Sequence, residues 1–301
     1  MNQAYSTTKP DLLPSFAVFL CGAAWGGFWF PLRLLAQFGV GGAWVSLIFA
    51  LVAILVPLPW IILKFKSLEQ FWVQMFTGLL IGFGFTLYNI SFALTDVLHV
   101  ILLFYLTPIW STLIAMWFYG ERLTWSRGLA IAAGFLGMAL ILGFKNGIPF
   151  PQRLGDWLSL FSGMLWALGT TRSHRRPTSQ VALPAFAFAV GCFVTSAAAL
   201  LIADQMGSSL SHSTNIWPAM PWIVGLALII FVPPNYVVLW ASQRLDSGRI
   251  GILLLSEVMV GSITAALYAG EKFGAAEIIG TALIICAGLI EVLGRRPSPA
   301  I

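Results

Sequence analysis

The sequence predicts an all-α integral membrane protein with ten transmembrane helices, arranged as two inverted five-helix repeats around a central cavity. Three observations support this prediction: the composition, the spacing of the apolar runs and an internal duplication. Hydrophobic residues make up 59% of the 301 residues and charged residues only 9%, and the mean hydropathy is +0.89. A water-soluble chain of this length needs far more charged surface, so the chain is expected to lie in a membrane.

Apolar runs of helical length recur along the whole chain. A helix needs about 20 residues to cross the roughly 30 Å of hydrocarbon. The alternating pattern of a membrane β-barrel is absent, so helices are the remaining way to pair every backbone group in lipid. The predicted spans are residues 15–37, 43–63, 71–94, 97–118, 124–143, 155–174, 181–203, 220–242, 248–268 and 275–293.

The ten spans divide into two halves of five. An odd number of crossings makes the second half start from the opposite side of the membrane, so the two repeats are inverted. A segment with Asn146-Gly147 and two prolines marks the boundary between them. The predicted organisation is a cytoplasmic tail at 1–14, a first repeat at 15–144, a linker at 145–154, a second repeat at 155–293 and a cytoplasmic tail at 294–301.

A duplicated turn supports this division. Gly120-Glu121-Arg122 follows one apolar run and precedes another, and Gly270-Glu271-Lys272 does the same 150 positions later. Glu121 and Glu271 stand where a helix begins, so we interpret both as turn residues that accept hydrogen bonds from free N–H groups.

The positive charges predict the orientation. Twelve of the sixteen Lys and Arg residues fall on the side that holds both termini. The positive-inside rule then places both termini in the cytoplasm. The net charge of +5 reflects this topology, and the scattered basic loops form no surface for nucleic acid.

The duplicated segments carry a family resemblance. Leu106-Thr107-Pro108-Ile109, followed by Tyr119-Gly120-Glu121-Arg122-Leu123-Thr124 and Gly128, resembles the EamA repeat of the drug/metabolite transporter superfamily. Ala269-Gly270-Glu271-Lys272 with Gly280 and Gly288 is similar to the same repeat. The aromatic-rich first, third and fourth spans most resemble the YddG-type exporters of aromatic amino acids in bacterial inner membranes. This resemblance implies export as the direction of transport and aromatic or other apolar amino acids as the cargo.

Glu257 is the most informative difference between the two repeats, because it replaces Thr107 at mid-membrane depth. An ionised carboxylate at this depth costs a few kcal/mol unless it faces water or a partner. The polar faces containing Glu257 in one repeat and Thr107 and Ser111 in the other are predicted to meet at the centre. Glu257 then binds a substrate ammonium group or takes up a proton, or it is a structural carboxylate hydrogen-bonded between helices.

Aromatic residues are expected to line the cavity. Trp25 and Trp166 are equivalent, since each follows a glycine, Gly22 or Gly163, by three residues. Such deep indoles can stack on an apolar substrate group or simply pack in the core. The candidate substrate-binding residues are Trp25, Tyr88, Asn89, Tyr105, Thr107, Trp110, Ser111, Trp166, Asn235 and Glu257.

Prolines within predicted spans indicate kinks. Pro233 and Pro234 directly precede Asn235 in the eighth span, and Pro108 lies in the fourth. Each removes a backbone hydrogen bond and leaves a carbonyl that protein or cavity water must satisfy. These prolines are candidate hinges for opening the cavity, with a fixed kink as the alternative.

The sequence contains no recognisable enzyme motif. His-Glu-x-x-His, Gly-x-Ser-x-Gly and phosphate-binding glycine loops are absent. The three cysteines lie in apolar spans without metal-ligand spacing, so no metal and no cofactor are expected.

The predicted function is therefore transport of a small-molecule substrate, an amino acid, by alternating access across a bacterial inner membrane, by a monomer in contact with membrane lipid. Two alternatives remain open at this point. The same architecture could export drugs or another metabolite. More remotely, the chain could be an intramembrane lipid-modifying enzyme that uses Glu257 as an acid or base.

Overall fold

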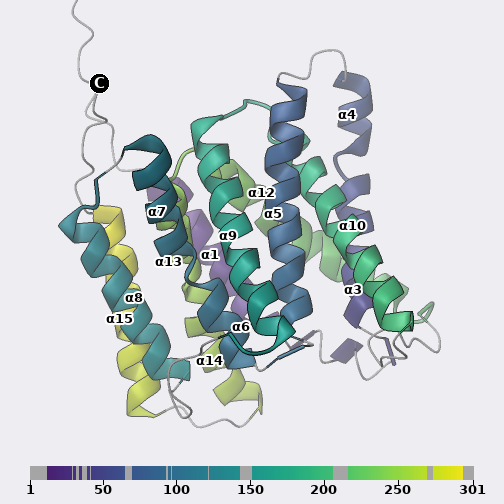
Figure 1. Cartoon of the computed structure of the whole chain (residues 1–301). Helices are drawn as coiled ribbons and strands as arrows, with labels where there is room; N and C mark the ends of the chain where they lie inside the picture. The colour runs from purple at the N-terminus through teal and green to yellow at the C-terminus, as the bar shows by residue number, and fades with distance from the viewer. Residues whose placement is uncertain are drawn as a thin grey trace, which may run out of the picture.

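The computed structural model is all-helical over the part of the chain that it describes (Figure 1). The described residues are 12–28, 30–31, 34–35, 39–40, 42–64, 70–92, 94–95, 97–120, 122–142, 151–205, 216–269 and 274–293.

Ten helical runs lie within these residues, five in each half. The first half contains α1 (Leu12–Gly26), α3 (Gly42–Leu55), α4 (Leu58–Lys64), α5 (Phe71–Ser91), α6 (Val97–Phe104), α7 (Thr107–Tyr119) and α8 (Trp125–Leu142). The second contains α9 (Leu154–Arg175), α10 (Ala182–Gln205), α11 (Met220–Leu226), the π-helix η2 (Ala227–Phe231), α12 (Val232–Ser242), α13 (Ser247–Leu254), α14 (Ser256–Ala269) and α15 (Ala275–Leu293). Helices that follow one another with only a short break form one run, as α3 and α4 do.

Seven of these runs are long and apolar enough to cross a membrane, and α1 and α8 are shorter apolar helices. The tenth, α9, is long but polar, because its inner faces carry buried Ser159, Ser162, Thr170 and Ser173. Ser159, Thr170 and Ser173 bind α6, α13 and α12, and Ser162 binds a carbonyl of α9 itself. The predicted all-helical membrane fold is confirmed.

Several predicted helices are interrupted. The predicted span 43–63 breaks at Val56 and Pro57, and the predicted span 220–242 contains the π-helix just before Pro233. Proline explains both, since it cannot donate a backbone hydrogen bond. The predicted span 15–37 is also interrupted, because α1 runs from Leu12 to Gly26, a turn follows at 27–28, and the described residues 30–31 and 34–35 are again helical.

The fourth helix of each repeat is broken at the equivalent place. In the first repeat Tyr105 and Leu106 separate α6 from α7, and in the second Leu255 separates α13 from α14. Pro108 in the first turn of α7 accounts for the first break. The second break has no proline, and the sequence did not predict it. There the Leu254 carbonyl accepts a hydrogen bond from Tyr105 of the other repeat.

Glycines lock each repeat to the broken helix of the other. A Cβ on Gly22 of α1 would lie 3.1 Å from the Leu254 carbonyl oxygen at the end of α13. A Cβ on Gly163 of α9 would lie 2.7 Å from the Phe104 carbonyl oxygen at the end of α6. These contacts correspond under the duplication, so the glycine pair seen in the sequence marks two equivalent helix crossings.

The fifth helices of the two repeats, α8 and α15, pack mainly on each other at one edge of the bundle (Figure 1, left). A Cβ on Gly137 would lie 2.6 Å from the Gly280 carbonyl oxygen, and the reverse distance is 2.5 Å. The two backbones therefore touch directly. The inner face of α9 packs on α5, α6 and α7 next to the breaks, which positions the site described next.

Candidate functional site

The two broken helices meet at Glu257, in the first turn of α14. The Tyr105 hydroxyl, from the break in the first repeat, donates to Glu257 Oε2 at 2.6 Å and to the Leu254 carbonyl at 3.0 Å. Tyr105 is 1% exposed. One phenol therefore holds both the carboxylate and the open backbone carbonyl of the opposite break.

A second tyrosine completes the surroundings of the carboxylate. The Tyr88 hydroxyl of α5 lies 3.5 Å from Glu257 Oε1, a long hydrogen bond. Its ring packs on Phe104 with the centroids 4.1 Å apart. Glu257 itself is half-buried and points to the interior of the bundle rather than to lipid. The structure thus brings three predicted site residues together: Tyr88, Tyr105 and Glu257.

Aromatic rings fill the centre of the bundle beside this carboxylate. Phe85 of α5 lies between the two equivalent tryptophans, with centroid distances of 5.8 Å to Trp25 and 6.2 Å to Trp166. It also contacts Phe188 at 5.6 Å and Phe231 at 5.7 Å. We call these five rings, together with Phe104, which lies 6.1 Å from Trp166, the central aromatic cluster. Phe85 was not among the predicted site residues, because its central position depends on contacts with four other helices.

Asn235 lies at the far side of this cluster, in a small pocket. Its amide donates to the Phe231 carbonyl at 2.7 Å, directly above Pro233 and Pro234. The side chain is 4% exposed. The pocket that it lines is formed by Ala53, Ala185, Phe188, Val232, Asn235, Tyr236 and Leu239. The Asn235 amide therefore caps a carbonyl next to the proline break.

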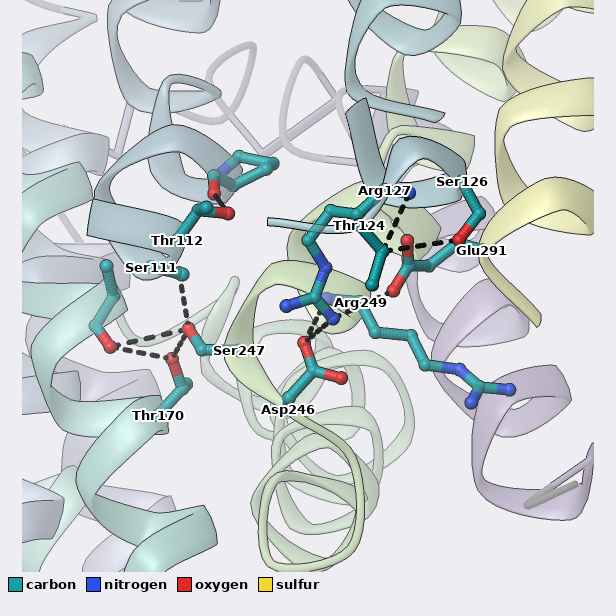
Figure 2. Close-up of polar contacts among 12 residues, drawn as sticks. Ser111, Thr112, Thr124, Ser126, Arg127, Thr170, Asp246, Ser247, Arg249 and Glu291 are labelled. Carbon is teal, nitrogen blue, oxygen red and sulfur yellow. Dashed lines mark hydrogen bonds and ion pairs between the residues drawn. The ribbon is translucent and has the colours of Figure 1, made fainter. Parts of the chain in front are cut away.

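Thr107 and Ser111 take part in contacts between helices. Thr107 donates to the Phe104 carbonyl at 2.6 Å and approaches the Gly163 carbonyl at 3.5 Å. Ser111 Oγ lies 2.7 Å from Ser247 Oγ, which lies 2.5 Å from Thr170 Oγ1 (Figure 2). These hydroxyls join α7, α13 and α9 near the predicted cytoplasmic end, the end where α7 finishes and α8 starts.

The predicted meeting of the two polar faces was therefore wrong. The α7 face packs on α9, the first helix of the other repeat, and the α14 face packs on α1. Thr264 of α14, for example, donates to the Gly26 carbonyl at 3.3 Å. Small residues let α7 pack closely on α9 and α14 pack closely on α1, so both polar faces are buried in these contacts. Only the breaks of the two fourth helices meet at the centre.

The remaining predicted residues have different surroundings. Asn89 is exposed, and its amide donates to the Phe85 carbonyl of its own helix. Trp110 on α7 is half-buried, and no hydrogen bond to its buried indole nitrogen is found among the described residues. Pro108 packs against Gly251, where an added Cβ would lie 2.9 Å from the ring. Glu121 and Glu271 lie outside the described residues.

An ion cluster closes the predicted cytoplasmic end (Figure 2). Arg127 Nη2 at the start of α8 lies 2.5 Å from Asp246 Oδ1 and 3.0 Å from Glu291 Oε1 of α15. The same Asp246 oxygen accepts from the Arg249 backbone N–H at 3.0 Å and so caps α13. The cluster joins the peripheral pair α8 and α15 to the broken helix. Sequence reasoning treated Arg127 only as a topology charge.

The predicted external end has its own buried carboxylate. Asp156 of α9 accepts from the Thr95 hydroxyl at 2.6 Å and lies 3.2 Å from His99 Nδ1. Its other oxygen accepts two backbone N–H groups, from Gln152 and Arg153, at 2.9 Å each. Asp156 thus ties the start of α9 to the turn that precedes α6. Among the described residues, no group of three or more His, Cys, Asp or Glu side chains could hold a metal ion.

The family model for EamA-like transporters matches the sequence twice, over residues 12–143 and 153–292. The chain belongs to the EamA-like transporter family. The two matches correspond to the two halves that share the broken fourth helix, so the two-repeat architecture is shown by both sequence and structure. This EamA-like transporter is accordingly a multi-pass membrane protein.

Several solved structures match this chain, and one of them is similar over almost the whole length of both chains. A chain titled only "Crystal structure of protein" superposes with a TM-score of 0.68 at 20% identity, covering 93% of this transporter and 96% of that chain. At this identity the likeness concerns the fold. No curated protein matches the sequence.

Proposed function

We propose that this EamA-like transporter exports aromatic and other apolar amino acids from the cytoplasm across a bacterial inner membrane, by alternating access. One observation carries the proposal. Glu257 is held by Tyr88 and Tyr105 where the two broken helices meet, directly beside the central aromatic cluster. A carboxylate next to a set of rings is the chemistry that recognises an ammonium group attached to an apolar body.

Each part of an amino acid finds a complementary group at this point. The ammonium group binds the Glu257 carboxylate, and the apolar side chain displaces or stacks on Phe85 between the two tryptophans. The substrate carboxylate binds at the half-helix N-termini of α7 and α14, which both begin at the breaks. The helix dipole favours an anion at such a terminus, and transporters use broken helices in this way.

The contacts at the two ends suggest how access alternates. Opening the predicted cytoplasmic end requires the Ser111–Ser247–Thr170 hydroxyls and the Arg127 ion cluster to separate. Opening the other end requires α6 to move away from α9, against the Asp156 contacts. The breaks beside Pro108 and Leu255 allow the half-helices to tilt independently, which makes them the hinges of the cycle.

A proton is the natural alternative occupant of Glu257. In the absence of substrate, protonation removes the carboxylate charge from the interior while Tyr88 and Tyr105 still contact the side chain. Substrate ammonium and proton then compete for one carboxylate, which couples export of one to import of the other.

Monocationic aromatic amines are the second candidate cargo. The described side chains that bind the Glu257 carboxylate are the two phenols, and the Asn235 amide nitrogen is occupied by the Phe231 carbonyl. A substrate carboxylate therefore depends on the helix dipoles at the breaks, where the N–H groups of Ile109, Trp110, Val258 and Met259 already bind backbone carbonyls. An amine without a carboxylate needs only Glu257 and the rings.

Proteoliposomes can decide between these cargoes. Uptake of labelled phenylalanine is measured with phenethylamine, which lacks the carboxylate, and 3-phenylpropionate, which lacks the amine, as competitors. The proposal expects labelled phenylalanine to be transported. Unlabelled phenylalanine should inhibit this uptake more strongly than either analogue does. Stronger inhibition by phenethylamine, together with transport of labelled phenethylamine, would select the amine alternative.

Variants test the assigned role of the carboxylate. Glu257→Gln should lower phenylalanine transport at least about thirtyfold, since removing one partner of a buried charge pair costs about 2–5 kcal/mol. The matched control is Glu277→Gln, which should transport normally. Glu277 is a half-buried acid at the start of α15, and its carboxylate accepts from the Gly274 backbone N–H. If the Glu257→Gln variant still transports phenylalanine and its transport does not respond to a pH gradient, Glu257 has no part in the mechanism.

A further inference from the structure

A stripe of exposed apolar side chains on α9 ends in two arginines. Trp157, Phe161, Met164 and Leu168 recur at helical spacing and are each at least 40% exposed. Arg172 and Arg175 continue the same spacing into the last turn. α9 lies between α5 and α7 on the front of the bundle in Figure 1, so this stripe faces the surrounding lipid.

The two arginines are fixed on the helices at either side. The Arg172 guanidinium lies 5.1 Å from the centre of the Phe76 ring, and its Nε donates to Thr77 Oγ1 of α5 at 3.1 Å. The Arg175 guanidinium lies 4.3 Å from the centre of the Tyr119 ring, the last residue of α7. Ring stacking leaves the planar edge of a guanidinium able to donate hydrogen bonds in a defined direction. The fork of the Arg172 Nη groups is thereby held in place at the membrane interface.

We propose that this surface binds an anionic phospholipid of the leaflet at the predicted cytoplasmic end. Arg172 and Arg175 bind the phosphate diester, and Leu168, Met164 and Phe161 contact one acyl chain. Half of the hydrocarbon core is about 15 Å thick, which corresponds to about ten residues of helix at 1.5 Å each. The distance along α9 from Arg172 to Phe161 is therefore the length that one lipid chain covers.

The arrangement fits a lipid better than a free anion. Guanidinium forks match phosphate oxygens, and basic residues at this depth attract anionic headgroups, but only a lipid uses the apolar stripe below them. A bound lipid would bridge α5, α9 and α7, which carry Tyr88, Trp166 and Ser111. This inference concerns the membrane environment and does not depend on which substrate is transported.

The test measures lipid preference of the whole purified chain. The association of spin-labelled phosphatidylglycerol is compared with that of spin-labelled phosphatidylcholine in nanodiscs of phosphatidylcholine. Each arginine should contribute about a fivefold preference for the anionic lipid, so Arg172→Gln with Arg175→Gln should lower the preference about twenty-fivefold. The matched control is Arg244→Gln, whose guanidinium also stacks on a ring, Trp240, but donates to the carbonyl of its own helix.

The competing outcomes are distinguishable. Preference that persists in the double variant, or that falls equally in Arg244→Gln, overturns the assignment. Displacement of the labelled lipid by inorganic phosphate or glycerol 3-phosphate at millimolar concentration would show an anion site without a lipid component, which also overturns it. An unchanged melting temperature of the double variant in detergent establishes that the loss comes from the arginines and not from unfolding.

Discussion

Removing Arg127 should release the predicted cytoplasmic end of the transporter. One guanidinium nitrogen holds two carboxylates, Asp246 and Glu291, and thereby joins α8, α13 and α15. Arg127→Gln leaves both acids without their partner. Breaking a fully buried ion pair from one side costs about 3–5 kcal/mol.

The expected cost is smaller than this limit. The Glu291 side chain is 7% exposed and the Asp246 side chain 22% exposed, and Asp246 keeps its bond to the Arg249 backbone N–H. We therefore expect Arg127→Gln to lower the free energy of unfolding by about 2–3 kcal/mol, which is less than the loss for a fully buried pair. For a chain of 301 residues that corresponds to a fall of roughly 3–5 °C in melting temperature.

The assay is thermal unfolding in detergent, with site-directed labelling as a second measurement. Ser247 is buried beside the cluster, so a Ser247→Cys reporter should react faster with an impermeant maleimide when Arg127→Gln is also present. Adding Glu291→Gln to Arg127→Gln should restore part of the stability, because one stranded charge disappears. The control is Arg244→Gln, which is exposed. If Arg127→Gln is no more destabilising than this control, the cluster does not hold the end closed.

Three further predictions follow from the packing. Gly163→Ala places a methyl 2.7 Å from a backbone oxygen and should cost about 1–3 kcal/mol, measured by thermal unfolding. Gly22→Ala should cost a similar amount, because the buried Ser256 hydroxyl can turn away from the methyl only by losing its hydrogen bond to the Phe19 carbonyl; a variant as stable as the parent chain would refute either expectation. Ser247→Ala removes the hydroxyl shared by three helices and should lower stability by about 1–2 kcal/mol, which a melting temperature equal to that of the parent chain would contradict. Asn89→Ala should leave the Km for transport unchanged, because its amide binds only its own helix, and a raised Km would place Asn89 in the site.

Much of the fold follows from the sequence. Hydropathy over about 20 residues is a local property, which is why the tenth helix was predicted at its observed limits, 275–293. The sequence alone also shows the duplication, the glycine pair Gly22 and Gly163, and the depth of Glu257 in its helix. Helix ends were less predictable where glycine or proline interrupts a long apolar run, as after Gly26.

The tertiary structure decided which of the polar residues meet. Arg127 has partners 119 and 164 positions away. The helix break at Leu255 has no proline, and the carbonyl before it is bound by a tyrosine from the other repeat. Ser111 and Thr107 have hydroxyls of the kind that contact substrates, but these hydroxyls form contacts with neighbouring helices. The sequence by itself determined that ten helical segments form two inverted copies, because burial in lipid acts on each segment separately. Which side chains face one another at the centre depends on how closely the helices cross, and that is set by contacts between residues far apart in the chain.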